Sequence, residues 1–557
     1  MAAALWLLLG LRWFDAAAAW RPAWLERVPT LVLVGATLGL AGLWLAGRWH
    51  ELGGPPPGGP RRALLLVVGV AVLFRLPLAW QGAAGYVTAD GALSGIVALH
   101  LRDGTEHLVF VPHVPYSGSL KSHLTAPLAA AIDPARAFAL VSVGFYAAFV
   151  AALYRLALLA GASGWAALAA GLYAAFAPAF VTRYSLSNDG NYVEVLTLGT
   201  WALVLAARWR REDRAPDLLS LAMGFVLGLA FWCHILAVIH AAAIALWALV
   251  VAPRRALRAV PAAALGFVIG DWPGLLWNAA NGWETFQYLR PGRVGGGAPA
   301  GGTGLVSRAW GLIADQSLVL LGYDPGYPAP IDYALKALAV LAAGVAAVAI
   351  IAAAREAWRR RSAELGLLLC FTAVNVLVAL VALPQIEGNP RYLQFLMAPL
   401  PVFLAWFLDA PRRRWLMAFL VAFGAAGSLA QGPGTVRADG QWRRFVADLE
   451  AEGVRWCDTD FHLATKINFL AQERVVCSSK LGPTTTEYFF DYRRQVEAAP
   501  AVALVAVNAT AAEKLERRLE RLAVTYERRD LMKPVLLRLS RKVDPEELFP
   551  GREFPLR

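Results

Sequence analysis

Long apolar stretches alternate along the chain with short polar segments, and each stretch approaches the length of a membrane-spanning helix. A helix needs about 20 residues to cross the ~30 Å hydrocarbon core of a bilayer. The apolar run from 217 to 252 is too long for one helix, so we expect a break near His234. The pattern predicts about twelve spans, at 28–47, 63–82, 136–159, 163–183, 191–208, 217–233, 235–252, 258–278, 333–353, 363–383, 391–409 and 414–431.

Arginine clusters mark one side of the predicted spans. The clusters are Arg61-Arg62, Arg208-Arg210-Arg211, Arg254-Arg255-Arg258, Arg355-Arg359-Arg360-Arg361 and Arg412-Arg413-Arg414. Short basic loops stay on the cytoplasmic side of a bilayer. Counting spans places all five clusters on that side. The long segments 83–135 and 279–332, the turns 184–190 and 384–390, and the chain after 431 are then predicted to lie outside.

The composition supports a polytopic membrane protein. Of the 557 residues, 58% are hydrophobic and 17% charged, and the mean hydropathy is +0.50. The net charge of +12 does not indicate a nucleic-acid partner, because the excess basic residues lie at span ends, where they orient helices and contact anionic lipids. We expect a multi-pass protein of the cell membrane, in bacteria the inner membrane.

From residue 432 onward the composition changes, and apolar segments of strand length alternate with amphipathic helical segments. This alternation predicts a small α/β domain with a partly parallel sheet at 432–557, outside the membrane domain 1–431. Cys457 and Cys477 end two strands that are joined by one helix, so they are expected to be neighbours. In an oxidising external compartment they can form a disulfide, but sequence spacing leaves the bond open.

The segments predicted outside collect most of the chain's unusual polar residues. Charges at membrane depth are costly, so ionisable groups at span ends need a reason. Carboxylates can act as general bases toward hydroxyls, and arginine and lysine can hold phosphate oxygens. One external cavity with both kinds of group fits transfer from a phosphate-linked donor, and simple hydration of span ends is the alternative. The residues are Asp90, Lys121, His123, Arg183, Asp189, Glu194, His234, Asp271, Arg290, Arg293 and Arg391.

Several of these residues also have a structural explanation. Asp90 begins an apolar helical segment, so it is either a base or a helix N-cap, and the two roles are compatible. Lys121 follows a Ser-Gly-Ser turn that either presents N–H groups to an anion or is an ordinary loop. For His234 a structural role is favoured, because it lies at a tight turn. For Glu194 a functional role is favoured, because a charge inside a span is costly. The histidines lack the spacing of zinc ligands.

Several short motifs resemble the GT-C membrane glycosyltransferases, in particular family 39-like bacterial relatives of the dolichyl-phosphate-mannose–protein mannosyltransferases. The first external loop carries Asp-Gly-Ala-Leu-Ser-Gly from Asp90 and Tyr-Ser-Gly-Ser-Leu from Tyr116. Later matches are Asn-Asp-Gly-Asn-Tyr-Val-Glu at 188–194, Trp-Pro-Gly-Leu-Leu-Trp-Asn at 272–278 and Asn-Pro-Arg-Tyr-Leu at 389–393. Their order and predicted sidedness extend the resemblance over about 65–430. Gly91 and Lys121 depart from it, because both stand where glutamate is frequent.

The resemblance implies an α-helical GT-C-like fold and a glycosyltransferase that uses a sugar on a polyprenyl or dolichyl phosphate at the outer face. It implies that Asp90 is the base, that the anomeric carbon inverts, and that the acceptor hydroxyl belongs to a glycan, lipid or protein. Arg391, with Lys121 or Arg183, would hold the donor phosphate. The candidate substrate-binding residues are His123, Tyr116, Glu194, Asp189, His234 and Asn278.

No cofactor is expected, although some relatives need a divalent metal, for which Asp189 and Glu194 would be the ligands. Two other functions stay open. A transporter or flippase of lipid-linked sugars is disfavoured, because we find no internal repeat and the polar residues lie at one face rather than at mid-membrane. An inactive relative that binds glycolipid is consistent with the departures at Gly91 and Lys121.

Overall fold

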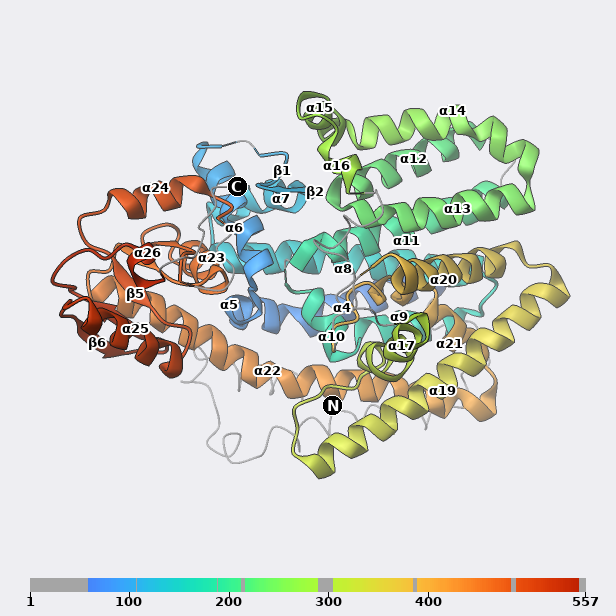
Figure 1. Cartoon of the computed structure of the whole chain (residues 1–557). Coiled ribbons are helices and arrows are strands. Elements are labelled where there is room, and N and C mark those ends of the chain that lie inside the picture. Colours follow the sequence, from blue (N-terminus) through green and yellow to red (C-terminus); the bar gives the residue numbers. More distant parts are fainter. Residues whose placement is uncertain are drawn as a thin grey trace.

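The computed structural model describes residues 59–106, 108–187, 189–211, 216–288, 304–383, 388–481 and 487–549 (Figure 1). The predicted span at 28–47 and the arginines Arg290 and Arg293 lie outside these residues. A bundle of helices forms most of the described chain. The strands and helices of the C-terminal region lie at one end of it.

Six helices of the described chain are long and apolar enough to cross a membrane, which supports a multi-pass membrane protein. They belong to α4 (Gly59–Gln81), α8 (Pro134–Leu159), α11 (Tyr192–Arg211), α19 (Ala329–Arg360), α20 (Ala363–Val381) and α22 (Arg414–Ala451). The other predicted spans within the described chain coincide with shorter or bent helices. These are α9 (Gly164–Ala175), α10 (Ala179–Tyr184), α12 (Pro216–Cys233), α13 (Val238–Val251), α14 (Pro253–Gly270), α15 (Trp272–Ala280) and α21 (Leu400–Leu408).

Three of the predicted apolar stretches are interrupted in the structure. The predicted break near His234 is confirmed, since α12 ends just before it and the short 3₁₀ helix η4 (Ile235–Ala237) follows. The predicted span at 258–278 is bent, because α14 and α15 meet at an angle of 73°. The predicted span at 163–183 is divided between two helices. There α9 ends at Ala175, and Pro178, which has no N–H to donate, begins α10.

Four glycines let α12 and α14 pack with their backbones in contact. A Cβ added at any of them would lie 2.0–2.2 Å from a carbonyl oxygen of the facing helix, so no larger residue fits without moving a helix. Small residues four positions apart are a common device for close packing of membrane helices. The glycines are Gly224 and Gly228 on α12 and Gly266 and Gly270 on α14.

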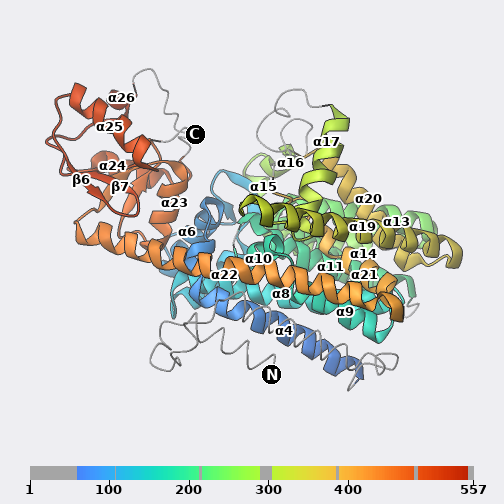
Figure 2. The same ribbon diagram turned by 90° about the horizontal axis from the view of Figure 1, so that it is seen from below.

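The helix α22 continues 20 residues beyond the predicted end of its span at 431, to Ala451. The predicted domain boundary at 431–432 therefore falls inside α22. Asp439 of α22 accepts a hydrogen bond from the Ala84 N–H (2.7 Å), and Arg443 pairs with Asp133 at the start of α8 (2.8 Å). Figure 2 shows α22 running along the helical bundle and on to the C-terminal strands.

Five strands of the C-terminal region form a mixed sheet in the order β4-β3-β5-β7-β6. The predicted parallel part comprises β4, β3 and β5, while β7 and β6 run antiparallel. The strands are β3 (Trp456–Asp458), β4 (Val476–Ser478), β5 (Ala503–Val505), β6 (Glu527–Asp530) and β7 (Pro534–Leu537), with helices α23 (Phe461–Leu470), α24 (Phe490–Ala498), α25 (Ala509–Arg521) and α26 (Pro545–Leu548).

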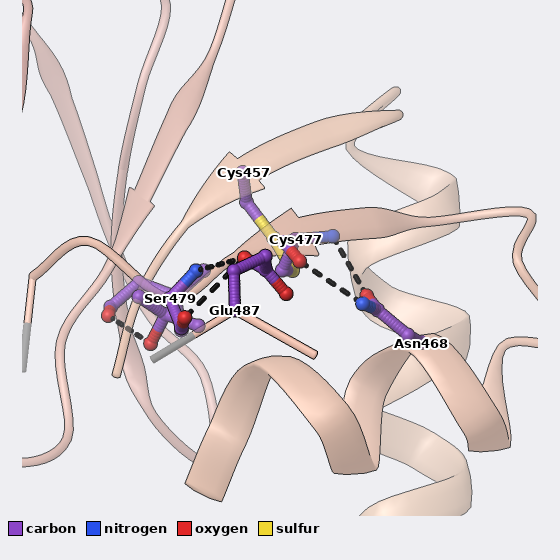
Figure 3. Close-up of a disulfide and its surroundings, with 7 residues drawn as sticks. Cys457, Asn468, Cys477, Ser479 and Glu487 are labelled. Carbon is purple, nitrogen blue, oxygen red and sulfur yellow. Dashed lines mark hydrogen bonds between the residues drawn. A yellow bond between two sulfur atoms is a disulfide. The ribbon is translucent and has the colours of Figure 1, made fainter. Parts of the chain in front are cut away.

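The disulfide that the sequence left open is present in the structure. Cys457 and Cys477 are direct partners on the parallel strands β3 and β4, and their sulfurs are bonded (Figure 3). Asn468 of α23 accepts from the Cys477 N–H (2.7 Å) and donates to its carbonyl (2.9 Å), which ties that helix to β4.

The C-terminal region packs directly on the helix α6 (Ala89–Asp103) through α23 and α24. Ile96 and Leu99 of α6 belong to the same hydrophobic cluster as Phe469 and Tyr492. Gly95 allows this approach, because a Cβ at that position would lie 2.5 Å from the Phe469 ring. The region therefore shares a core with the helix that carries Asp90.

Candidate active site

Asp90 lies in the first turn of α6 with an exposed side chain. Within the described residues it makes no hydrogen bond and no ion pair. The cap position belongs to Thr88, whose hydroxyl accepts from the Gly91 N–H (3.2 Å), so the cap role considered for Asp90 was wrong. The Asp90 carboxylate is therefore open to a ligand at the N-terminal end of α6.

Asp189, in the 3₁₀ helix η3 (Asp189–Asn191), is held between Thr88 and Arg183. Its carboxylate accepts a hydrogen bond from the Thr88 hydroxyl and lies 3.4 Å from Arg183 Nη2. Because the side chain is only 8% exposed, this carboxylate fixes the start of α6 rather than facing solvent. The two acidic groups at this end of α6 thus have different surroundings.

Asn191 joins three segments of the site, and we did not predict it as a site residue. Its side-chain NH₂ donates to the hydroxyl of Ser117 (3.1 Å), the Gly118 carbonyl (2.6 Å) and the Cys233 carbonyl (2.9 Å). It therefore ties η3 to β2 (Val114–Gly118) and to the end of α12. The one sequence feature that points to Asn191 is the turn motif Asn-Asp-Gly-Asn, because glycine and asparagine adopt positive φ most readily. In the structure Gly190 and Asn191 both do so (57° and 55°).

Arg391 lies half-buried among tyrosines. Its Nη2 donates to the Tyr392 hydroxyl (2.9 Å), and its guanidinium lies 4.9 Å from the centre of that ring. Its Nε is buried without a partner, and no carboxylate of the described residues pairs with it. Tyr184 links this side to Arg183, because the Arg183 guanidinium lies 5.6 Å from its ring and its hydroxyl donates to Asn389 (3.2 Å).

Aromatic rings connect the predicted outer segments into one continuous wall. Tyr288 contacts Tyr116 (4.8 Å between ring centres), Tyr116 contacts His234 (5.5 Å), His234 stacks on Tyr192 (5.4 Å), and Tyr192 contacts Tyr392 (6.3 Å). Of these tyrosines only Tyr116 was predicted as a site residue. We name this row of rings the aromatic wall. Figure 1 shows the elements that bring it together, β2 beside α16 (Glu284–Gln287) at the ends of α12 and α13.

Asp90 belongs to the same neighbourhood as the aromatic wall. Burial raises the pKa of Tyr116, and the negative charge of Asp90 raises it further. Tyr488, from the C-terminal region, also has a raised pKa, through burial and then through Asp90 and Tyr288. Asp90 therefore interacts electrostatically with Tyr116 and with Tyr488. Tyr488 follows Asp90 by 398 positions in the sequence.

His234 has the structural role that the sequence favoured. Its Nδ1 accepts from the Leu236 N–H (3.1 Å), its backbone bridges to Ser117, and its ring lies between Tyr116 and Tyr192. Asn278 is also used internally. Its side chain donates to the Gly274 carbonyl (2.8 Å) and accepts from the Thr285 N–H (3.0 Å), which fixes the turn before Tyr288.

Lys121 and Glu194 form an enclosed ion pair. The Lys121 Nζ lies 2.7 Å from Glu194 Oε1, and the two side chains are 1% and 0% exposed. Lys121 belongs to α7 (Leu120–Ala129), and it also donates to the Ser187 carbonyl (3.4 Å). Since each charge compensates the other, neither group is presented to a ligand in this arrangement. His123, on the same helix, is exposed, and its Nδ1 lies 2.9 Å from the Ser119 carbonyl oxygen.

The two carboxylates to which a metal would be assigned already have cationic partners. Asp189 pairs with Arg183, and Glu194 pairs with Lys121. Within the described residues, no group of three or more histidine, cysteine, aspartate or glutamate side chains is arranged to hold a metal ion.

Comparisons with known proteins identify the fold. No protein-family model and no curated protein sequence matches this chain. Among solved structures, ArnT from Cupriavidus metallidurans in the apo state is similar at a TM-score of 0.56 and 10% identity, over 85% of this chain and 97% of that one. The oligosaccharyltransferase AglB from Archaeoglobus fulgidus, solved with an inhibitory peptide and a dolichol-phosphate, aligns at a TM-score of 0.48 and 13% identity, over 83% and 70%. The likeness to ArnT shows the GT-C fold, as the motifs predict.

Proposed function

We propose that this GT-C-fold protein is a membrane glycosyltransferase that moves a sugar from a polyprenyl-phosphate-linked donor to an acceptor hydroxyl. One observation carries the proposal: Asp90 is exposed and unpaired in the first turn of α6, near an aromatic wall that also holds Arg391 without a carboxylate partner. An acid and a cation that do not neutralise each other leave room for a substrate with a nucleophilic hydroxyl and an anionic leaving group.

The reaction assigns one role to each group. As the acceptor oxygen attacks the anomeric carbon, its proton passes to Asp90, and the bond from that carbon to the phosphate oxygen breaks with its electron pair. Attack opposite the leaving group inverts the anomeric carbon. Arg391 and Arg183 stabilise the negative charge that develops on the lipid phosphate. Tyrosines of the aromatic wall offer ring faces to the sugar.

Lys121 is left out of the phosphate-binding set, because its ammonium is enclosed and paired with Glu194. Asp189 and Asn278 become positioning residues, since their polar atoms are engaged by Thr88, Arg183, Gly274 and Thr285. His123, Tyr116 and His234 remain candidates for contact with the sugar or the acceptor.

We place the site on the extracytoplasmic face of the membrane. The disulfide between Cys457 and Cys477 supports this side, because such bonds persist in oxidising compartments. Cysteine labelling tests it. A membrane-impermeant maleimide should label Trp283→Cys in intact cells and Trp358→Cys only after permeabilisation, since both positions are exposed and lie at opposite predicted faces. The reverse pattern would refute the placement.

Loss of transfer in Asp90→Asn tests the reaction. Purified protein in nanodiscs, supplied with membrane lipid extract, should release free polyprenyl phosphate as sugar is transferred. Replacement of a catalytic base typically costs 10²–10⁴-fold in rate, so we expect a loss of about that size with an unchanged unfolding temperature. Asp103→Asn, at the exposed other end of α6, is the matched control.

The same assay separates the remaining alternatives. Full transfer by Asp90→Asn would remove Asp90 from its role. Translocation of lipid-linked sugar without release of lipid phosphate, from wild type as well as from the variant, would identify a flippase. Binding of glycolipid with neither activity would identify an inactive relative.

A further inference from the structure

The C-terminal region places a lysine beside the candidate active site. Lys466 lies on α23, which packs on α6, and its side chain is only 7% exposed. The contact between Phe469 and Gly95 sets the position of α23 along α6. Figure 2 shows α23 between α6 and the strands of the C-terminal region.

The ammonium group of Lys466 has no carboxylate partner within the described residues. Its Nζ lies 4.2 Å from the centre of the Trp442 ring of α22, and it makes no hydrogen bond there. The charged groups that act on it come from three elements, namely Asp439 of α22, Asp189 of η3 and Arg183 of α10.

Both of those carboxylates are already engaged elsewhere. Asp439 accepts from Arg443 Nε (2.7 Å) and from the Ala84 N–H (2.7 Å). Asp189 accepts from Thr88 and pairs with Arg183. Lys466 therefore contrasts with Lys121, which is more enclosed (1% against 7% exposed) and has Glu194 at 2.7 Å. A mostly buried amine without a carboxylate partner is disfavoured in its charged form, unless a ligand supplies the opposite charge.

Burial lowers the pKa of Lys466 to about 7, with Asp439 and Asp189 opposing the shift and Arg183 adding to it. The amine is therefore charged below about pH 7 and neutral above it. A bound anion would favour the charged form, because an opposite charge stabilises it.

We propose that Lys466 is a further anion-binding residue of this site, which holds a phosphate of a lipid-linked ligand together with Arg183. The inference rests on the proposed function and adds to it a ligand from the C-terminal region. The C-terminal region then contributes one of the residues that bind the donor phosphate.

Binding of a short-chain polyprenyl monophosphate to the protein in nanodiscs tests this from pH 6 to pH 8.5. Lys466→Met keeps the apolar stem and should weaken binding about 10-fold at pH 6, the effect of losing one charge-assisted contact worth roughly 1.4 kcal/mol. Lys466→Arg stays charged, so the ratio of its affinity to that of wild type should rise with pH above 7. The ionisation of the ligand is common to all variants and cancels in that ratio.

Lys514→Met, at an exposed lysine of α25, is the control and should bind as wild type does. Wild-type affinity in Lys466→Met, or a constant ratio of Lys466→Arg to wild type, would overturn the inference. Inorganic phosphate that binds as tightly as the lipid would overturn the assignment to a lipid-borne phosphate.

The two proposals fail in distinguishable ways. Asp90→Asn should still bind the lipid phosphate, because Asp90 acts on the acceptor and not on the donor phosphate. Absence of lipid-phosphate binding in the wild type would refute the donor site of the proposed function as well. Normal binding without any effect of Lys466 would refute only this inference.

Discussion

Two groups of charged residues in this protein differ in how their charges are compensated. Lys121 and Glu194 form a closed pair, enclosed and 2.7 Å apart. Asp90 and Arg391 form an open set, in which neither group has a partner of opposite charge within the described residues. Both kinds of group look alike in sequence, as ionisable residues at the outer ends of predicted spans.

The difference teaches where to expect stability and where to expect chemistry. Removing one member of a buried pair leaves an uncompensated charge, whereas removing a group that faces a ligand leaves the fold intact. The following changes test that distinction.

The largest expected effect is on the closed pair. Glu194→Gln should lower the free energy of unfolding by about 3–5 kcal/mol, because Lys121 is then buried without a counter-charge. Thermal unfolding in nanodiscs measures it. The double variant Lys121→Leu/Glu194→Leu should recover most of the loss, since apolar replacements of a buried pair are often neutral. Lost transfer with unchanged stability in Glu194→Gln would instead place Glu194 in the active site.

Substitutions in the open set, Asp90 and Arg391, should lower activity rather than stability. Arg391→Gln should raise the KM for the lipid-linked donor about 10- to 100-fold, as the loss of a charged phosphate contact does, with little change in unfolding temperature. Steady-state kinetics with donor and acceptor varied separately measure it. Arg494→Gln, at an exposed position on α24, is the control. A larger effect on the acceptor than on the donor would reassign Arg391.

Thr88 should affect both stability and activity, because it caps α6 and also donates a hydrogen bond to Asp189. Thr88→Ala should cost about 1 kcal/mol of stability through the lost cap, and should lower kcat by misplacing Asp90. Thr88→Ser should restore both. Thr105→Ala, at an exposed position just beyond the C-terminal end of the same helix, should change neither. A drop in stability at constant kcat would show that α6 need not be held rigidly.

The smallest effect concerns the contact between α6 and the C-terminal region. His100 lies 3.0 Å from Glu106 and 2.9 Å from Glu473. Burial alone would lower the pKa of His100, but hydrogen bonds and charges from Glu473 and Glu106 outweigh it and raise the pKa above 6.5.

A raised pKa in the folded protein gives stability that is fully present below pH 6.5 and is lost as the pH rises through the folded value. Unfolding temperatures from pH 5.5 to pH 8.5 should therefore show wild type losing its advantage over His100→Gln as the pH rises. His462→Gln, at an exposed histidine of α23, should follow wild type. An advantage that grows with pH would contradict the predicted sign.

The apolar pattern of the sequence predicts most of the helices, because transfer of a segment from water to lipid depends on the residues of that segment alone. The breaks at His234 and at Asp271 also have local signals. A turn at His234 follows from the length of the apolar run, and Pro273 in the first turn of α15 marks the 73° bend at Asp271. The close packing of α14 on α12, by contrast, depends on glycines distant in sequence.

The sequence predicts individual residues of the site, but it does not predict which of their charges pair with each other. Asp90 and Arg391 stand out in sequence because motifs and span ends mark them, and the structure leaves both unpaired. Lys121 looks like a phosphate ligand until Glu194, 73 positions later, is seen beside it. Lys466 lies on an ordinary amphipathic helix of the C-terminal region, and no local signal points to it.

The sequence by itself determined the membrane-spanning architecture and the acidic and basic residue types at one end of it. Only the tertiary structure decided which charges neutralise each other and which remain available to a ligand. The physical reason is that hydropathy is a sum over neighbouring residues, whereas an ion pair depends on the distance between two atoms that the chain brings together from far apart.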